Sequence, residues 1–361
     1  MMLDHKRLLL VGRYPPPLGG NTIHMQRLVQ RLLADRIPMS VLDIYNPGSG
    51  EADAADPNRL AFSGFTGTRS ARYVRLFRAL RARARDAIIH IHIAAGTNFY
   101  RYAWLLGRLT AGAHKRVLTI HSGGWVGVFA TLSPAQKKRA LRVIGSFDDV
   151  ICVNAQQHAL LSQHVSSRLH LIPAYLPPSN EQAPLPDSVH QLRRAVDVMI
   201  VTSGYGTAVY DYETVLRAVE LAQRRVSTRI GLAVATYTTW DRPYWEQILG
   251  RLRSSPVPTV TTTDLSPPQF LAVLAHAELY VRATLADGDA VAIREAASVG
   301  TRVVATDAVP RQAGTCLFRS GDAEALAGHI AAALMNPELG RLPQAAFPDN
   351  YQEILRVYRA G

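Results

Sequence analysis

The chain has 361 residues, 48% of them hydrophobic and 19% charged, and a formal net charge of +12, which favours two domains with buried cores and excludes global disorder. No apolar run reaches the roughly 18 residues that a membrane-spanning helix needs, and the N-terminus lacks the pattern of a secretory signal. The two cysteines, Cys152 and Cys316, lie far apart, which argues against a zinc or disulfide framework and favours a cytoplasmic location.

Strand and helix patterns alternate along the first half of the chain. Apolar stretches of strand length occur at 7–11, 39–44, 87–93, 116–121, 150–154 and 169–173. Helical patterns are predicted after the loop at 12–20 and over 69–85, 98–111, 134–144 and 156–164, with a long loop at 48–68. This alternation is typical of βαβ units and predicts a parallel sheet.

The second half repeats the alternation after a Pro-rich linker at 177–186. Strands are predicted at 197–202, 229–235, 259–262, 279–282 and 302–306, and helices at 212–225, 243–252, 267–275, 290–298, 322–334 and 351–358. We therefore predict an α/β fold with two doubly wound Rossmann-like domains, at 1–178 and 179–345, facing each other across a cleft. The C-terminal helix, within 346–361, could cross back to the first domain.

An acidic loop between a strand and a helix is the strongest candidate for a binding site. The predicted strand ends at Arg282, the loop contains Asp287, Gly288 and Asp289, and the following helix contains Glu295. Glycine lets a ligand approach the backbone closely, and the free N–H groups and dipole of a helix N-terminus suit phosphate. The same residues could instead form an ordinary solvated loop that caps a helix.

The stretch from Asp287 to Asp307 resembles the signature of glycosyltransferase family 4, the retaining enzymes with the GT-B fold. Asp287 stands where the first glutamate of that signature usually occurs, and Glu295 stands at the second. The resemblance implies that the Asp287 region contacts the donor sugar and that Glu295 binds the ribose. The donor site would also include Gly288, Asp289, Ala290 and Arg294. The shorter side chain of Asp287 would affect the choice of sugar more than the reaction class.

Two other loops complete the expected donor site. Gly19 and Gly20 follow three prolines at the first strand–helix junction, where family members typically have a Gly-Gly pair near the donor phosphate. A turn that merely caps the first helix is the alternative. His121 ends a predicted strand before a Gly pair, and the resemblance places such a histidine near the transferred sugar. His90 and His92 should share one face of their strand, and none of these histidines has a metal-ligand spacing.

The chain departs from family 4 where its second domain begins. The family usually has an Arg and a Lys there that clamp the diphosphate, but here the segment around Gly204 has no Arg or Lys between Arg194 and Arg217. We expect Gly204 to lie at the donor site and Arg282 to replace the missing clamp. An ion pair between Arg282 and one of the loop aspartates is an equally favoured alternative.

Positive charge is confined to the first half of the chain. Residues 1–180 contain 23 Lys and Arg against 9 Asp and Glu, whereas residues 181–361 contain 17 against 19. The helix predicted at 69–85 has an apolar stripe that should pack on the sheet and an arginine face that could contact anionic lipid. We therefore expect peripheral attachment to the inner face of the cytoplasmic membrane through the first half, and no nucleic-acid partner.

The resemblance to family 4 implies a retaining, metal-independent enzyme of the hexosyltransferase type. The first domain would bind a glycan or polyprenyl-diphosphate-linked acceptor, and the second a nucleotide-sugar donor, as the resemblance implies. The donor is a substrate, so no cofactor and no metal ligand are expected. The role would lie in bacterial surface or exopolysaccharide synthesis. A non-catalytic GT-B partner subunit and a sugar-nucleotide epimerase of the same fold are the alternatives.

Overall fold

A computed structural model shows that the chain forms two compact units. The described residues are 7–15, 18–43, 74, 78–94, 110, 112–122, 124–178, 182–237, 241–287 and 290–360. The N-terminal unit comprises Met1–Pro16, Asn21–Leu176 and Asp349–Gly361, and the C-terminal unit comprises Pro17–Gly20 and Pro177–Pro348. The chain thus passes from the first unit to the second at Pro177 and returns at Asp349 for its last helix.

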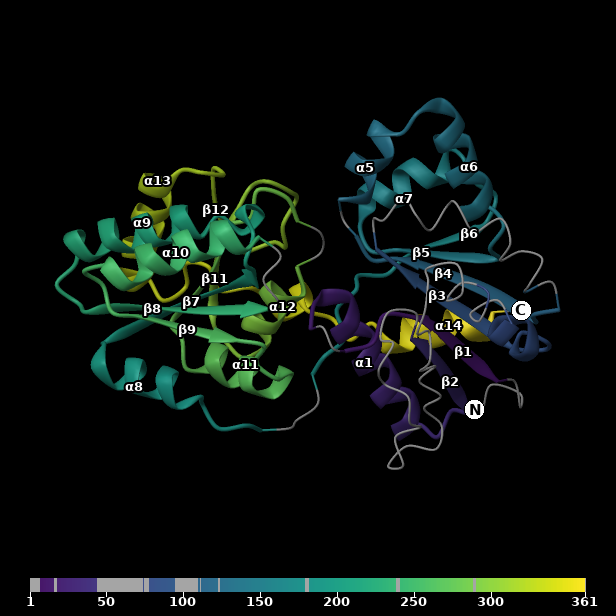
Figure 1. Cartoon of the computed structure of the whole chain (residues 1–361), viewed down its shortest axis with the longest axis horizontal. Coiled ribbons are helices and arrows are strands. Elements are labelled where there is room, and N and C mark those ends of the chain that lie inside the picture. The colour runs from purple at the N-terminus through teal and green to yellow at the C-terminus, as the bar shows by residue number, and fades with distance from the viewer. Residues whose placement is uncertain are drawn as a thin grey trace. The chain divides into compact units, whose positions relative to one another are not determined.

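The N-terminal unit contains a parallel sheet of six strands in the order β2-β1-β3-β4-β5-β6 (Figure 1). The strands are β1 (Leu8–Gly12), β2 (Met39–Asp43), β3 (Ile88–Ile93), β4 (Lys115–Ile120), β5 (Asp149–Cys152) and β6 (Arg168–Leu171). The described helices of this unit are α1 (Gly20–Ala34), α5 (Trp125–Thr131), α6 (Pro134–Ile144), α7 (Ala155–Ser162) and α14 (Tyr351–Arg359).

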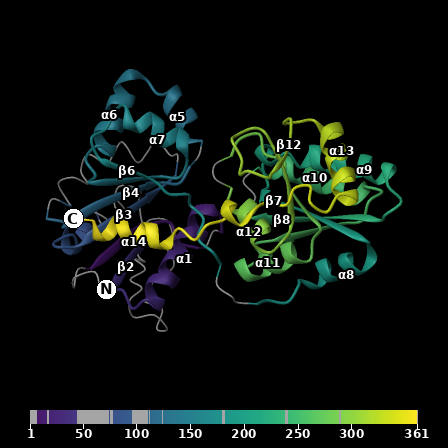
Figure 2. The ribbon, with the colours of Figure 1, turned by 180° about the vertical axis from the view of Figure 1, so that it is seen from behind.

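The two faces of this sheet bury separate apolar cores because side chains alternate along each strand. On β1, Leu9 packs into one core and Leu10 into the other. The second core also contains Met25 from α1 and Leu355 from α14. The C-terminal helix therefore lies against the N-terminal sheet, as the view from behind shows (Figure 2).

The C-terminal unit contains a second parallel sheet, in the order β12-β11-β10-β7-β8-β9 (Figure 1). Its strands are β7 (Val198–Tyr205), β8 (Ile230–Tyr237), β9 (Thr259–Thr263), β10 (Leu279–Arg282), β11 (Arg302–Thr306) and β12 (Cys316–Phe318). Its helices are α8 (Asp187–Ala195), α9 (Tyr212–Arg225), α10 (Arg242–Ser254), α11 (Pro267–Ala275), α12 (Val291–Ser298) and α13 (Ala323–Met335), with short 3-10 turns at Ala208–Tyr210 and Gln344–Ala346.

Apolar residues on both faces of the second sheet are buried, as expected for a parallel sheet that helices cover on both sides. Ile200 packs into one core and Met199 into the other. Each unit is therefore a doubly wound α/β domain, which confirms the predicted fold class. Among the described residues, no helix combines the length and the apolar character needed to cross a membrane.

The structure differs from the sequence prediction at several elements. Helices α5 and α8 and the short strand β12 were not predicted. β4 ends at Ile120, so His121 is the first residue after the strand rather than its last. The loop at 48–68 and most of the helices predicted at 69–85 and 98–111 lie outside the described residues, apart from a helical stretch at 78–83.

Candidate functional site

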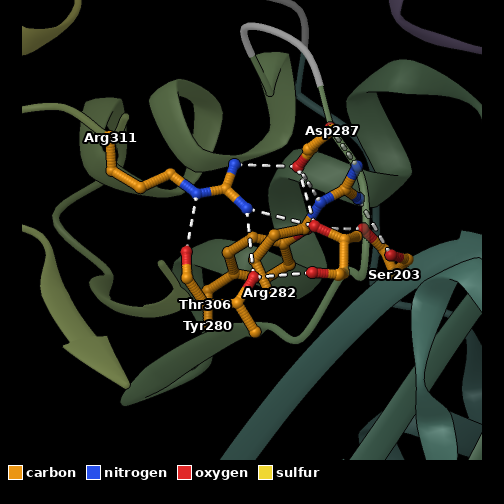
Figure 3. Close-up of polar contacts among 7 residues, drawn as sticks. Ser203, Tyr280, Arg282, Asp287, Thr306 and Arg311 are labelled. Atoms are coloured by element: carbon orange, nitrogen blue, oxygen red, sulfur yellow. Dashed lines mark hydrogen bonds and ion pairs between the residues drawn. The ribbon is translucent and has the colours of Figure 1, made fainter. Parts of the chain in front are cut away.

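Three neighbouring strands of the C-terminal sheet end at one edge and carry polar side chains there. β10 lies between β7 and β11, and all three are parallel, so their carboxyl ends meet. Arg282 ends β10, Thr306 ends β11, and Ser203 lies near the end of β7. Open α/β sheets bind ligands at this edge. Figure 3 shows these residues in one polar cluster together with Asp287 and Arg311.

Arg282 and Asp287 form a bidentate ion pair at this edge. Arg282 Nε donates to Asp287 Oδ2 at 2.9 Å, and Nη2 donates to Oδ1 at 3.1 Å. Both side chains are nearly buried, with 11% and 9% of their surface exposed. Of the two alternatives that the sequence leaves open for Arg282, the structure contains the ion pair with Asp287.

Arg311 is a second guanidinium in the same cluster, and the sequence reasoning missed it. Its Nη1 donates to Asp287 Oδ2 at 2.8 Å, and its Nε donates to the Thr306 carbonyl at 3.1 Å. Only 1% of the Arg311 side chain is exposed. Its place in the loop that follows the end of β11 was the available signal, because such loops lie at the ligand-binding edge of a parallel sheet.

The charges around Asp287 keep it ionised. Burial raises the pKa of Asp287, but the neighbouring guanidinium groups of Arg282 and Arg311 outweigh burial and hold that pKa well below its usual range. Thr284 Oγ1 adds a hydrogen bond to Oδ2 at 3.2 Å. Two guanidinium groups thus surround one carboxylate, and the cluster carries a net positive charge.

An aromatic ring covers Arg282 and explains the glycine at position 204. The Arg282 guanidinium lies 4.9 Å from the centre of the Tyr210 ring, and its Nη1 donates to the Ser203 carbonyl at 3.1 Å. A Cβ added at Gly204 would lie 1.9 Å from Tyr210 Cδ1. Gly204 is therefore close to the predicted site, and its lack of a side chain lets Tyr210 pack over Arg282.

Helix α12 begins shortly after Asp287 and carries two of the predicted donor-site residues. Ala290 is its N-cap residue and makes no side-chain capping bond. Arg294 donates to the Ala346 carbonyl and is 8% exposed, and Glu295 is 5% exposed. Gly288 and Asp289, also predicted at the donor site, lie outside the described residues.

Gly19 and Gly20 of the first loop lie in different environments. Leu18–Gly20 belongs to the C-terminal unit, and Tyr205 Oη donates to the Leu18 carbonyl at 3.0 Å. A Cβ at Gly19 would lie 2.1 Å from Tyr205 Oη, whereas one at Gly20 would meet only Val291 Cγ2 at 3.8 Å. A side chain at Gly19 would therefore displace Tyr205 Oη from its bond to Leu18, whereas Gly20 has room for a small side chain.

His121 lies in the N-terminal unit together with the other histidines singled out from the sequence. His90 and His92 share one face of β3, as predicted, with ring centres 3.9 Å apart. His90 is fully paired: its Nδ1 lies 2.6 Å from Tyr358 Oη and its Nε2 lies 2.7 Å from Thr119 Oγ1. His121 Nε2 lies 2.9 Å from His92 Nδ1.

The chain was compared with known proteins by sequence and by structure. No family model matches it, and no curated protein matches it in sequence. Similar solved structures include sucrose-phosphate synthase from Thermosynechococcus elongatus, with a TM-score of 0.73, 19% identity and coverage of 98% of both chains. Anabaena HepE in complex with UDP and glucose has a TM-score of 0.67 at 14% identity and covers 98% of this chain and 97% of its own.

A third similar structure is an α,α-trehalose-phosphate synthase (UDP-forming) from Burkholderia xenovorans in complex with glucose-6-phosphate. It has a TM-score of 0.64 and 13% identity, and the match covers 98% of this chain and 96% of that one. These matches extend over both units and over nearly the whole length of each neighbour. At identities this low the likeness defines the fold, and the chain has the GT-B fold of two Rossmann-like domains.

Proposed function

We propose that the chain is a retaining glycosyltransferase of the family 4 type, which binds a nucleotide-sugar donor at the carboxyl edge of its C-terminal sheet. The convergence of Arg282 and Arg311 on one carboxylate, close to the start of α12, carries this proposal. The cluster has more positive than negative charge, and a helix N-terminus favours phosphate. The structure of HepE with UDP and glucose supports a donor of this class.

The two guanidinium groups would neutralise the diphosphate of the donor. A phosphate accepts two parallel N–H bonds from arginine, as the Asp287 carboxylate does here, so a diphosphate would compete with Asp287 for the same donors. This role fills the place of the Arg and Lys that the β7 segment lacks. Preorganised positive charge at a leaving group is usually the largest catalytic contribution.

A retaining transfer can then proceed at one face of the sugar. The bond between the anomeric carbon and the donor phosphate oxygen breaks, and the electron pair leaves with the diphosphate. The acceptor hydroxyl oxygen forms the new bond to the anomeric carbon, and its proton passes to the departing phosphate oxygen. In this proposal Asp287 orients the donor sugar, Glu295 binds the ribose, and the diphosphate charge is met by side chains rather than by a metal.

Two acceptor classes remain within this proposal. A glycan or polyprenyl-diphosphate-linked acceptor at the inner membrane surface would account for the excess of positive charge in the first half of the chain. A sugar phosphate is the second candidate, because glucose-6-phosphate is bound in the Burkholderia xenovorans structure. Sedimentation with anionic vesicles distinguishes them, since only the first candidate requires binding that weakens as salt is added.

A thermal-shift screen with UDP, GDP, ADP and dTDP tests the donor site directly. We expect one of them to raise the melting temperature, because a ligand that binds only the folded state stabilises it. Arg311→Met should lose most of that shift, whereas Arg253→Met, at an exposed position in the last turn of α10, should retain it. Absence of a shift with every nucleotide, or equal shifts in both variants, would contradict a donor site at this edge.

Product analysis separates the alternatives that share this fold. A transferase forms a nucleoside diphosphate together with a glycosylated acceptor. An epimerase converts one nucleotide sugar into another and needs no acceptor. A non-catalytic partner subunit would bind the nucleotide or a second protein without turning any donor over. Incubation with the donor that matches the preferred nucleotide, with and without acceptors of both classes, therefore gives a different product pattern for each.

A further inference from the structure

Three histidines of the N-terminal unit meet at the carboxyl ends of its central strands. His24 comes from α1, His92 from β3, and His121 follows β4. One ring nitrogen of each lies within 4.8 Å of a ring nitrogen of both others. His24 and His92 are 3% and 6% exposed, and His121 is partly exposed. The three side chains thus form a nearly buried cluster that solvent reaches on the His121 side.

The environment of His24 leaves one ring nitrogen ready to accept a ligand. His24 Nδ1 donates to the Ala174 carbonyl at 2.6 Å, because a carbonyl oxygen can only accept. A neutral ring with its proton on Nδ1 has a lone pair on Nε2. That Nε2 is buried and makes no hydrogen bond to any described residue. Histidines that bind metals commonly have this arrangement, in which the second nitrogen donates to a carbonyl.

His92 and His121 leave two more nitrogens without partners. Their mutual bond, at 2.9 Å between His92 Nδ1 and His121 Nε2, uses one nitrogen of each ring. His92 Nε2 and His121 Nδ1 are buried and bond to no described residue. Because one ring donates in that mutual bond, one of the two outer nitrogens carries a hydrogen and the other a lone pair. A metal ion would use one nitrogen of each ring and would replace the His92–His121 bond.

The chemistry of the donor atoms limits what that ligand can be. The candidate ligand atoms of the cluster are ring nitrogens of His24, His92 and His121, and among the described residues no carboxylate oxygen is grouped with them. Neutral imidazole is the ligand that zinc and other late first-row divalent ions prefer, whereas calcium and magnesium prefer oxygen.

We propose that His24, His92 and His121 bind a divalent transition-metal ion of the zinc class, with a fourth coordination position left open. Zinc bound by three histidines and one exchangeable ligand is a common arrangement. Zinc–nitrogen bonds of about 2.0–2.1 Å place tetrahedral ligand atoms roughly 3.3 Å apart. The candidate ligand atoms lie within 4.8 Å of one another, so the rings must shift by up to about 1.5 Å and the His92–His121 hydrogen bond must break. His121 then acts as a ligand rather than as a direct contact to the sugar.

The neighbouring His90 does not provide a fourth histidine ligand. His90 stacks on His92, but both of its nitrogens already have partners in Tyr358 and Thr119. Gly12, at the end of β1, lets this strand pack closely against α1 and β3, because a Cβ there would lie 2.8 Å from Met25 Cε and 3.0 Å from His92 Cβ.

Metal binding by the full-length chain, purified without a histidine tag and freed of metal by a chelator, tests the proposal. After loading with zinc and dialysis, elemental analysis should find about one zinc ion per chain, and cobalt should give the visible absorption of a tetrahedral site. His24→Ala, His92→Ala and His121→Ala should each weaken binding by more than the roughly 10–100-fold that a lost supporting hydrogen bond costs.

His276→Ala is the matched control, because His276 is an exposed histidine at the end of α11 and should leave metal binding unchanged. Circular dichroism identifies any variant that fails to fold, and the partly exposed His121 is the safest of the three to replace. An internal water would also satisfy the three nitrogens. Absence of retained zinc and of the cobalt spectrum in the wild-type chain, or unaltered binding in all three variants, overturns the proposal in favour of such a water.

Discussion

Arg282 and Arg311 donate to the same oxygen atom of Asp287, at 2.9 Å and 2.8 Å from Oδ2. Arg282 ends β10 and Arg311 lies in the loop after β11, so the Asp287 carboxylate links the ends of two neighbouring strands. Because two cations share one anion, the cluster has an excess of positive charge that suits an anionic ligand. We propose that the diphosphate of the donor competes with the Asp287 carboxylate for these two guanidinium groups.

Asp287→Asn should therefore lower the stability of the folded chain while it strengthens anion binding. The amide keeps the shape of the side chain but leaves two nearly buried guanidinium groups without a counter-charge, so unfolding should become easier by about 3–5 kcal/mol. Inorganic pyrophosphate should bind this variant more tightly than the wild type, because it no longer competes with a carboxylate. Calorimetric melting with and without pyrophosphate measures both effects, and weaker pyrophosphate binding would argue against a phosphate site here.

The lowered pKa of Asp287 also predicts how the stability of the folded chain depends on pH. The pKa of Asp287 is lower in the folded chain than in the unfolded one, so its contribution is fully present above the ordinary aspartate pKa of about 4 and is lost as pH falls through the folded value. We expect the melting temperature of the C-terminal unit to fall below about pH 4. Asp287→Asn should show a shallower fall, and identical slopes would mean that other groups control acid stability.

Gly204→Ala tests the packing of Tyr210 over Arg282. The new methyl group would overlap the ring, which must shift away from the guanidinium, so we expect a loss of about 1–3 kcal/mol and weaker nucleotide binding. Gly250→Ala in α10 is the matched control, because no atom lies within 4 Å of its added Cβ and alanine favours helix by about 1 kcal/mol. Chemical unfolding of both variants gives the comparison, and equal effects would contradict the steric argument.

The pattern of apolar residues within single segments predicted most of the strands and helices. Strands such as β1 and β10 are short apolar runs between loops, and their alternation with helices predicts parallel sheets before any contact is known. The return of the chain to the first unit does not follow from local pattern, because it depends on the apolar core against which α14 packs. In the structure Leu355 of α14 is buried in one core with Leu8 and Leu10 of β1.

Clusters built from distant segments could not be predicted in the same way. Arg311 reaches Asp287 only because β10 and β11 are neighbours in the sheet. His24 comes from a helix, His92 from a strand and His121 from the loop after another strand, so no short spacing between them resembles a metal motif. In both cases the relevant information is the order of strands, which follows from tertiary packing rather than from the pattern of any one segment.

Leu355→Ala tests whether α14 is an integral part of the N-terminal unit. Leu355 is 1% exposed in the core shared with β1 and α1, so removing most of its side chain should cost about 2–5 kcal/mol. Met335→Ala at the end of α13 removes an apolar side chain that is 80% exposed and should have almost no effect. Calorimetry should assign the loss to one transition, and an unchanged melting profile would contradict the packing of α14 on this sheet.

Glu295→Gln tests the proposed ribose contact. A carboxylate accepts stronger hydrogen bonds than an amide, so the preferred nucleoside diphosphate should bind this variant roughly ten-fold more weakly, which corresponds to about 1.4 kcal/mol. Glu324→Gln is the control, because that side chain on α13 is 61% exposed and removing its charge should leave affinity unchanged. Titration calorimetry with the nucleoside diphosphate and with pyrophosphate distinguishes the causes. A ribose contact predicts weaker binding of the nucleotide alone, whereas equal losses for both ligands would mean that Glu295 acts on the phosphate cluster instead.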